Sequence, residues 1–175
     1  MESASILQSI AEVAVGLAGF GGIAAGLGYR TRGEWSAQDR VRLLGVVVNS
    51  LFVILGCFLP FAVHHLGIQP PWFLSGAVLC VAPVWGFWLQ WRRVVAHSQA
   101  GHVSVQSGYN PPLAAVIALI NLVALTLFLA VAFGVAKPGI EFGLYLTAVL
   151  LVLVNAAVSF LRLLATAFGE DAPSA

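Results

Sequence analysis

Glu12 is a carboxylate within an apolar stretch near the start of the chain, and an ionisable group in that setting is a candidate for ion or proton handling. His64, His65 and Lys137 are expected on the same side of the membrane as Glu12. Together these residues could bind a cation or relay protons, because histidine titrates near neutral pH. The alternative is that Glu12 is a charge near a helix N-terminus, where the helix dipole favours an anion.

Three asparagines form a second candidate site: Asn49, Asn121 and Asn155. Each is expected to lie roughly seven to ten residues from the cytoplasmic end of its helix, which is about 10 to 15 Å deep at the helical rise. An amide in hydrocarbon needs hydrogen-bond partners, so we expect the three side chains to share one layer. That layer would either hold the helices together or form a polar constriction in a conducting or substrate pathway.

Small residues recur every four positions along the first apolar segment, at Ala14, Ala18, Gly22 and Gly26. Small residues at this spacing let two helix backbones approach closely, and this close packing drives helix association in lipid. The sequence therefore predicts that this face is a packing surface. It would contact either the rest of the same chain or a second copy in a homo-oligomer.

Arginines dominate the polar segments that flank the apolar ones. Attraction to anionic lipid headgroups explains such residues, and docking of a cytoplasmic protein is the alternative. Arg162 is expected to extend its side chain to the headgroups. The remaining candidates for lipid or partner contacts at the inner face are Arg30, Arg32, Arg40, Arg42, Arg92 and Arg93.

Other chemistry finds little support in the residue pattern. Cys57 and Cys80 lie in apolar runs, where a thiol behaves as a small hydrophobe. The four histidines lack the thiolate or carboxylate company of a zinc site, so we predict no metal and no cofactor. Glu12 has no acidic companion in the bilayer, so we predict no catalytic residues and no enzymatic activity. The basic residues form no stripe, which argues against nucleic-acid binding.

The elements that position these residues follow from composition. Of the 175 residues, 60% are hydrophobic and 9% are charged. A soluble domain has about one quarter charged residues, so this chain cannot cover a water-facing surface. The sequence predicts an all-α polytopic transmembrane bundle forming a single domain over residues 1–168, followed by a disordered tail at 169–175. The five expected spans cover about 6–28, 43–63, 72–91, 113–136 and 140–168.

Two prolines fall inside the expected spans, and other parts of the chain can replace the hydrogen bonds that these prolines remove. Pro60 and Pro83 should kink their helices because proline lacks a backbone N–H. Neighbouring helices and side chains can then satisfy the freed carbonyls.

The distribution of basic residues predicts the orientation. With five spans, all seven arginines fall on one side of the membrane and Lys137 falls on the other. Lys/Arg bias in short loops sets topology, so we expect the N-terminus outside and the C-terminus inside.

The strings AEVAVGLAGFGGIAAGLGYRTRGEWSAQDRVRL, which includes Glu12, and NAAVSFLRLL, which begins at Asn155, carry a resemblance. In them the chain resembles small bacterial multi-spanning inner-membrane proteins of uncharacterised function. The resemblance covers the first span, the loop after it and the fifth span. It implies a bacterial origin and an inner-membrane location, and it implies no activity.

Two functions are compatible with these features. The first is a non-enzymatic membrane protein that self-associates through the small-residue face into a channel or permeation-type complex. The second is an accessory or anchoring subunit that docks a cytoplasmic partner through its basic inner loops. Ion flux favours the first, whereas a stoichiometric partner in native membranes favours the second.

Overall fold

The computed structural model describes residues 2–32, 37–68, 70–99, 111–135 and 139–168, and these residues contain α-helices and no β-strand. The predicted tail at 169–175 lies outside the described residues. The helices are α1 (Glu2–Arg32), α2 (Ala37–His65), α3 (Pro71–Leu79), α4 (Val81–Gln99), α5 (Pro111–Ala132) and α6 (Glu141–Phe168).

Five segments of the described chain are long and apolar enough to cross a membrane, so the prediction of an all-α chain with five candidate spans is confirmed. Their ends lie within a few residues of the predicted ones. The segments are Ser3–Leu27, Arg42–His65, Pro71–Leu89, Pro112–Ala132 and Glu141–Ala165.

The helices continue beyond the apolar segments into polar sequence. The first helix runs to Arg32 and α4 runs to Gln99, beyond the predicted span ends at about 28 and 91. Polar residues such as Arg and Gln are good helix formers, so the end of an apolar run does not mark the end of a helix.

The two internal prolines have different effects on their helices. Pro83 has no N–H to donate to the carbonyl of Leu79, and α3 ends at Leu79 while α4 begins at Val81. In contrast, α2 continues through Pro60. The carbonyl that Pro60 deprives of a donor belongs to Gly56, four residues earlier, and the Tyr145 hydroxyl donates to this oxygen at 2.7 Å. A side chain of α6 thus replaces a lost backbone hydrogen bond of α2, as expected for proline in a membrane helix.

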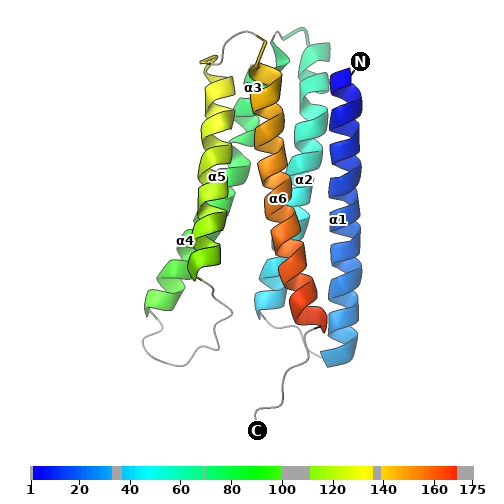
Figure 1. The fold of residues 1–175 in the computed structure, drawn as a ribbon, viewed down its shortest axis with the longest axis vertical. Helices are drawn as coiled ribbons and strands as arrows, with labels where there is room; N and C mark the ends of the chain where they lie inside the picture. The colour runs from blue at the N-terminus through cyan, green and yellow to red at the C-terminus, as the bar shows by residue number, and fades with distance from the viewer. Residues whose placement is uncertain (1, 33–36, 69, 100–110, 136–138, 169–175) are drawn as a thin grey trace. The chain divides into compact units, whose positions relative to one another are not determined.

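The chain divides into two compact units, and the helices that form them are labelled in Figure 1. The terminal unit comprises Met1–Ile54 and Leu153–Ala175, and it contains α1, the first part of α2 and the last part of α6. The central unit is Leu55–Val152, and it contains the remainder of α2 and α6 with α3, α4 and α5.

In the terminal unit, α1 packs closely through Gly21. A Cβ built at Gly21 would lie 3.0 Å from Val46 of α2 and 3.9 Å from Phe160 of α6. Nearer the C-terminal end of α1, Ala24 and Ala25 form a buried cluster with Leu163, against which Leu43 and Leu164 pack. Small residues on α1 therefore bring three helices together.

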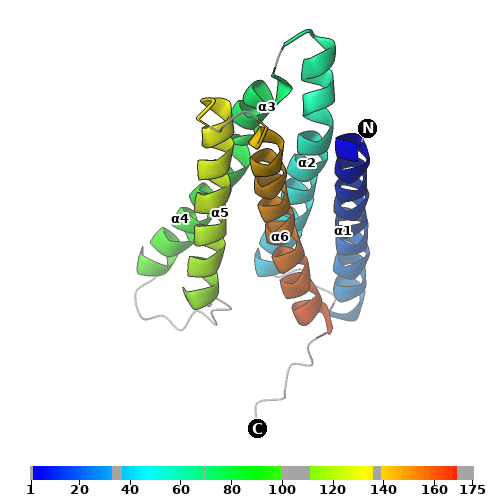
Figure 2. The same ribbon diagram turned by 45° about the horizontal axis from the view of Figure 1, so that its top comes forward.

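In the central unit, α5 packs against both α3 and α4 (Figure 2). Gly76 of α3 makes the closest approach, because a Cβ built there would lie 3.0 Å from the backbone oxygen of Phe128. Aromatic rings fill the neighbouring space. Tyr145 is fully buried, and its ring centroid lies 5.5 Å from that of Trp72 and 6.0 Å from that of Phe128.

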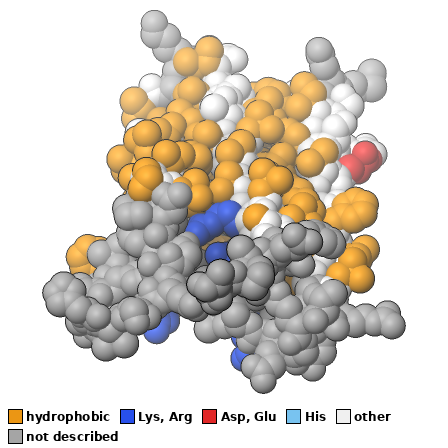
Figure 3. All heavy atoms as spheres, turned by 60° about the horizontal axis from the view of Figure 1, so that its bottom comes forward, with side chains coloured by type: hydrophobic (Ala, Val, Ile, Leu, Met, Phe, Trp, Pro, Cys, Tyr) orange, Lys and Arg blue, Asp and Glu red, His pale blue; other side chains and the backbone are white. Residues whose placement is uncertain are grey.

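Hydrophobic side chains also make up much of the outer surface of the helices (Figure 3). Phe20 is 64% exposed, Leu161 is 62% exposed and Phe133 is 77% exposed. Soluble proteins seldom expose contiguous apolar surface on this scale, whereas lipid contact requires it. The surface is therefore that of a membrane-embedded protein.

Candidate functional site

The outward face of α1 carries a hydrogen-bonded polar pair inside a candidate membrane span. The amide of Gln8 donates to Oε1 of Glu12 at 3.0 Å, and both side chains are exposed. The candidate span begins at Ser3, so Glu12 lies about 14 Å along it at the helical rise. A carboxylate at this depth is costly unless it is paired or hydrated.

Four glycines continue the same face of the helix. Apart from the neighbouring residues and backbone of α1 itself, no atom of the described residues lies within 4 Å of a Cβ built at Gly16, Gly19, Gly22 or Gly26. We call these four glycines, with Gln8 and Glu12, the outward stripe. Val15 and Ile23, both exposed, flank it. The stripe is a partly polar face, and no other described element lies against its four glycines.

The predicted ridge of small residues is divided between two faces of α1. Ala14 is fully buried and Ala18 is half-buried, whereas Gly22 and Gly26 are exposed and belong to the outward stripe. A spacing of four residues advances about 40° around a helix with 3.6 residues per turn, so the ridge winds away from the buried face. The part that packs inside the chain continues instead through Gly21, Ala24 and Ala25.

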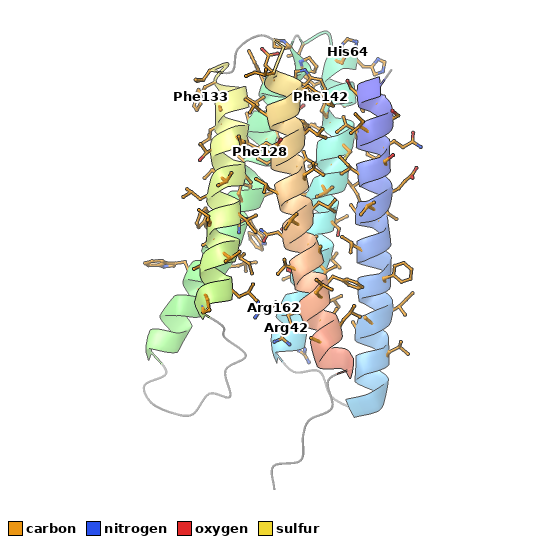
Figure 4. The ribbon with its side chains drawn as sticks, in the orientation of Figure 1. Arg42, His64, Phe128, Phe133, Phe142 and Arg162 are labelled. Atoms are coloured by element: carbon orange, nitrogen blue, oxygen red, sulfur yellow. The ribbon has the colours of Figure 1, made fainter. Side chains whose placement is uncertain are left out.

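A second group of polar residues lies between α2 and α6 of the terminal unit. A Cβ built at Gly45 would lie 3.2 Å from the Ser159 hydroxyl oxygen, so the two backbones are close there. One helical turn from this contact, Arg42 and Arg162 lie next to each other (Figure 4), and their charges interact. Both side chains are half-buried.

The same antiparallel register places Asn49 of α2 level with Asn155 of α6. Each is four residues from the Gly45 and Ser159 contact, in the direction away from the arginines. Asn155 is 5% exposed and Asn49 is half-buried. From Arg42 to Asn49, polar side chains therefore follow the α2 and α6 pair at three successive levels.

The third asparagine of the predicted layer, Asn121, belongs to the central unit. It is 3% exposed, its amide donates to the Ile117 carbonyl at 2.9 Å, and a Cβ built at Gly86 would lie 2.7 Å from its side-chain oxygen. Its local role is thus helix packing between α5 and α4. A layer that includes all three asparagines stays a prediction, because Asn121 belongs to another unit than Asn49 and Asn155.

Ser50 has an unusual environment within α2. Its side chain is fully buried, and its hydroxyl oxygen has no hydrogen-bond partner among the residues that the structure describes. A serine inside a helix commonly donates to the carbonyl four residues earlier, as Ser75 does to Pro71 at 2.8 Å. Ser50 therefore carries a desolvation cost that nothing in its surroundings offsets.

The predicted cluster around Glu12 stays a prediction. His64 and His65 are exposed at the end of α2 in the central unit, with ring centroids 6.1 Å apart, whereas Glu12 lies in the terminal unit. Lys137 lies outside the described residues. Within the described part of the chain, no three His, Cys, Asp or Glu residues are placed to hold a metal ion.

The predicted inner-face arginines have different surroundings. Arg40 is exposed, and Arg92 lies over the Trp88 ring with its guanidinium carbon 4.9 Å from the centroid. This cation–π contact fixes Arg92 to its own helix. Arg42 lies next to Arg162, and the side chains of Arg30, Arg32 and Arg93 lie outside the described part of the structure.

Sequence reasoning missed three features of these sites. Gln8 precedes Glu12 by four residues, which is the spacing of a same-face pair, so the signal was available. The partner of Pro60 could not be found in this way, because Tyr145 is 89 residues from Gly56. The arginine pair between Arg42 and Arg162 likewise depends on the register of two distant helices.

Comparisons with protein families, curated proteins and solved structures find no match to this chain.

Proposed function

We propose that this chain is a non-enzymatic inner-membrane protein that associates with further copies of itself through the outward stripe, forming a permeation-type complex. The observation that carries the proposal is the exposed pair of Gln8 and Glu12 on the same face as four uncovered glycines. The charge distribution supports an orientation with the N-terminus outside and the C-terminus inside.

Contact between this stripe and lipid is energetically unfavourable. A carboxylate facing hydrocarbon costs on the order of 3 kcal/mol on insertion scales, and glycines offer lipid little contact area. A second copy of α1 fits both features, because glycines allow close approach and the amide and carboxyl groups can bond across the contact. Self-association therefore covers a polar face that the described part of the chain leaves open.

Glu12 gives such an assembly its chemistry. A carboxylate can accept several hydrogen bonds, and Gln8 supplies one of them. Copies of Glu12 brought together around one axis would line a polar path and favour cations over anions. The proposed role of Glu12 is therefore to bind a permeating cation or proton.

Cross-linking tests the association. In a background with Cys57→Ala and Cys80→Ala, Gly19→Cys should form a disulfide-linked dimer in membranes under mild oxidation. Phe20→Cys is the matched control, because Phe20 lies one residue further along α1 on a different, exposed face. Equal cross-linking of the two variants would contradict an interface on the outward stripe.

Ion flux into liposomes tests permeation. We expect Glu12→Gln to preserve the Gly19→Cys cross-link and reduce cation flux at least about tenfold, as for loss of a charge-assisted contact. Gly22→Leu in the Gly19→Cys background should abolish both cross-linking and flux, because Gly22 belongs to the same stripe and nothing within the described chain opposes its added side chain. An impermeant oligomer would end the permeation proposal, and a stoichiometric foreign partner with no self-association would favour the accessory subunit instead.

A further inference from the structure

Arg42 and Arg162 form a pair of like charges at one end of the terminal unit, separate from the outward stripe. Arg42 is the first residue of the candidate span in α2, and Arg162 lies three residues before the end of the span in α6. The two side chains converge (Figure 4) and interact electrostatically. Two cations so close repel each other, and a bound anion between them would convert this repulsion into attraction.

From this geometry we propose that Arg42 and Arg162 together bind the phosphate of an anionic phospholipid headgroup. Guanidinium groups donate to phosphate oxygens in a fork, and each has several N–H donors, so other contacts of either arginine leave donors for a phosphate. The site goes beyond self-association, because it concerns another ligand and another face of the unit.

The surroundings fit a phosphate at this level. Ser159 lies one helical turn before Arg162 in α6. Gly45 lies opposite Ser159 and contributes no side chain. The Ser159 hydroxyl is therefore a further donor near the same space. Both arginines are half-buried, which strengthens their interaction with an anion relative to a fully solvated pair.

The source of the phosphate follows from the position of the pair. Both arginines belong to segments apolar enough to lie in a membrane, and they stand at the same end of those segments. Basic side chains lie at the border of the hydrophobic surface in the end view (Figure 3). The phosphate found at that border of a bilayer belongs to a lipid headgroup, and an arginine there reaches it by extending its side chain.

The test is lipid binding by the purified full chain in detergent, measured by native mass spectrometry and by the shift in thermal midpoint. Phosphatidylglycerol should bind and stabilise the wild type, whereas phosphatidylcholine should not. Arg162→Gln and Arg42→Gln should each weaken phosphatidylglycerol binding about tenfold, as for loss of one charge-assisted contact. Arg162→Lys should give an intermediate loss, because lysine keeps the charge and loses the fork.

Arg92→Gln is the matched control, since Arg92 is exposed and engaged with Trp88. If phosphatidylglycerol were held only by diffuse attraction to basic residues, Arg92→Gln and Arg162→Gln would weaken its binding equally. That result would overturn the proposed site. Stabilisation by inorganic phosphate without any by lipid would overturn the lipid assignment. The thermal midpoint of each variant without lipid shows whether it is folded. If Arg162→Gln does not fold, the comparison of Arg162→Lys with the wild type still tests the site.

Discussion

The central and terminal units differ in how the polar side chains of their helices are hydrogen-bonded and buried. In the central unit, Asn121 donates to Ile117, Ser75 donates to Pro71, and Tyr145 donates to the Gly56 carbonyl. The terminal unit instead exposes Glu12 on an apolar helix and buries the Ser50 hydroxyl without a hydrogen bond.

This difference separates scaffold from candidate site. A polar group that is buried against its partner in the same chain is stable in a membrane, and such a group needs no further explanation. Polar groups that face outward, or that bring like charges together, gain from a ligand or a second copy. The terminal unit is therefore where we place both self-association and lipid binding.

The largest effect is expected where the central unit is packed most tightly. In Gly76→Val, the new side chain would meet the backbone oxygen of Phe128, which cannot move aside as a flexible side chain can. We expect a loss of about 3 kcal/mol, seen as a lower thermal midpoint in detergent.

The matched control is Gly143→Val in α6, where no atom lies within 4 Å of the added Cβ. Both variants replace a helical glycine of the central unit with the same residue, so their helix propensities change equally. Equal midpoints would show that the contact between α3 and α5 does not hold the central unit together.

A smaller loss is expected from Tyr145→Phe. This change keeps the ring and removes the donor to the Gly56 carbonyl, which Pro60 already deprives of its helical partner. The unsatisfied buried carbonyl should cost about 2 kcal/mol, measured by the thermal midpoint.

A double-mutant cycle with Pro60→Ala tests the reason for that loss. Alanine at position 60 restores a backbone N–H for the Gly56 carbonyl, so Tyr145→Phe should then cost clearly less. An unchanged cost in the Pro60→Ala background would show that Tyr145 acts through another contact.

Much of the fold could be predicted from the sequence because the membrane signal is local. Apolar runs of sufficient length predict five candidate spans, and their ends were placed within a few residues. The extension of α1 to Arg32 was missed, because arginine and threonine in a helix cannot be told from a loop by hydropathy. The prediction that a neighbouring group satisfies a carbonyl freed by proline is confirmed at Pro60.

The candidate site was less accessible to sequence reasoning, because it depends on which way each helix faces. The four-residue spacing predicted one packing face, whereas Gly22 and Gly26 turn outward from the buried Ala14. The pairing of Arg42 with Arg162 needs the register of α2 against α6, which no local pattern encodes. The facing and register of the helices thus determine which polar side chains meet, whereas the composition indicates that the helices lie in a membrane.

The smallest effect, and the one with opposite sign, is expected from Ser50→Ala in the terminal unit. Removing a buried hydroxyl that has no hydrogen bond should raise stability by about 1 kcal/mol, because its desolvation cost disappears while the backbone is unchanged. Ser9→Ala on exposed α1 surface is the control and should leave the thermal midpoint unchanged within about 0.5 kcal/mol. A lower midpoint for Ser50→Ala would mean that Ser50 has a stabilising partner in the assembled protein. In that case the contrast between the units would hold for Glu12 but not for the interior of α2.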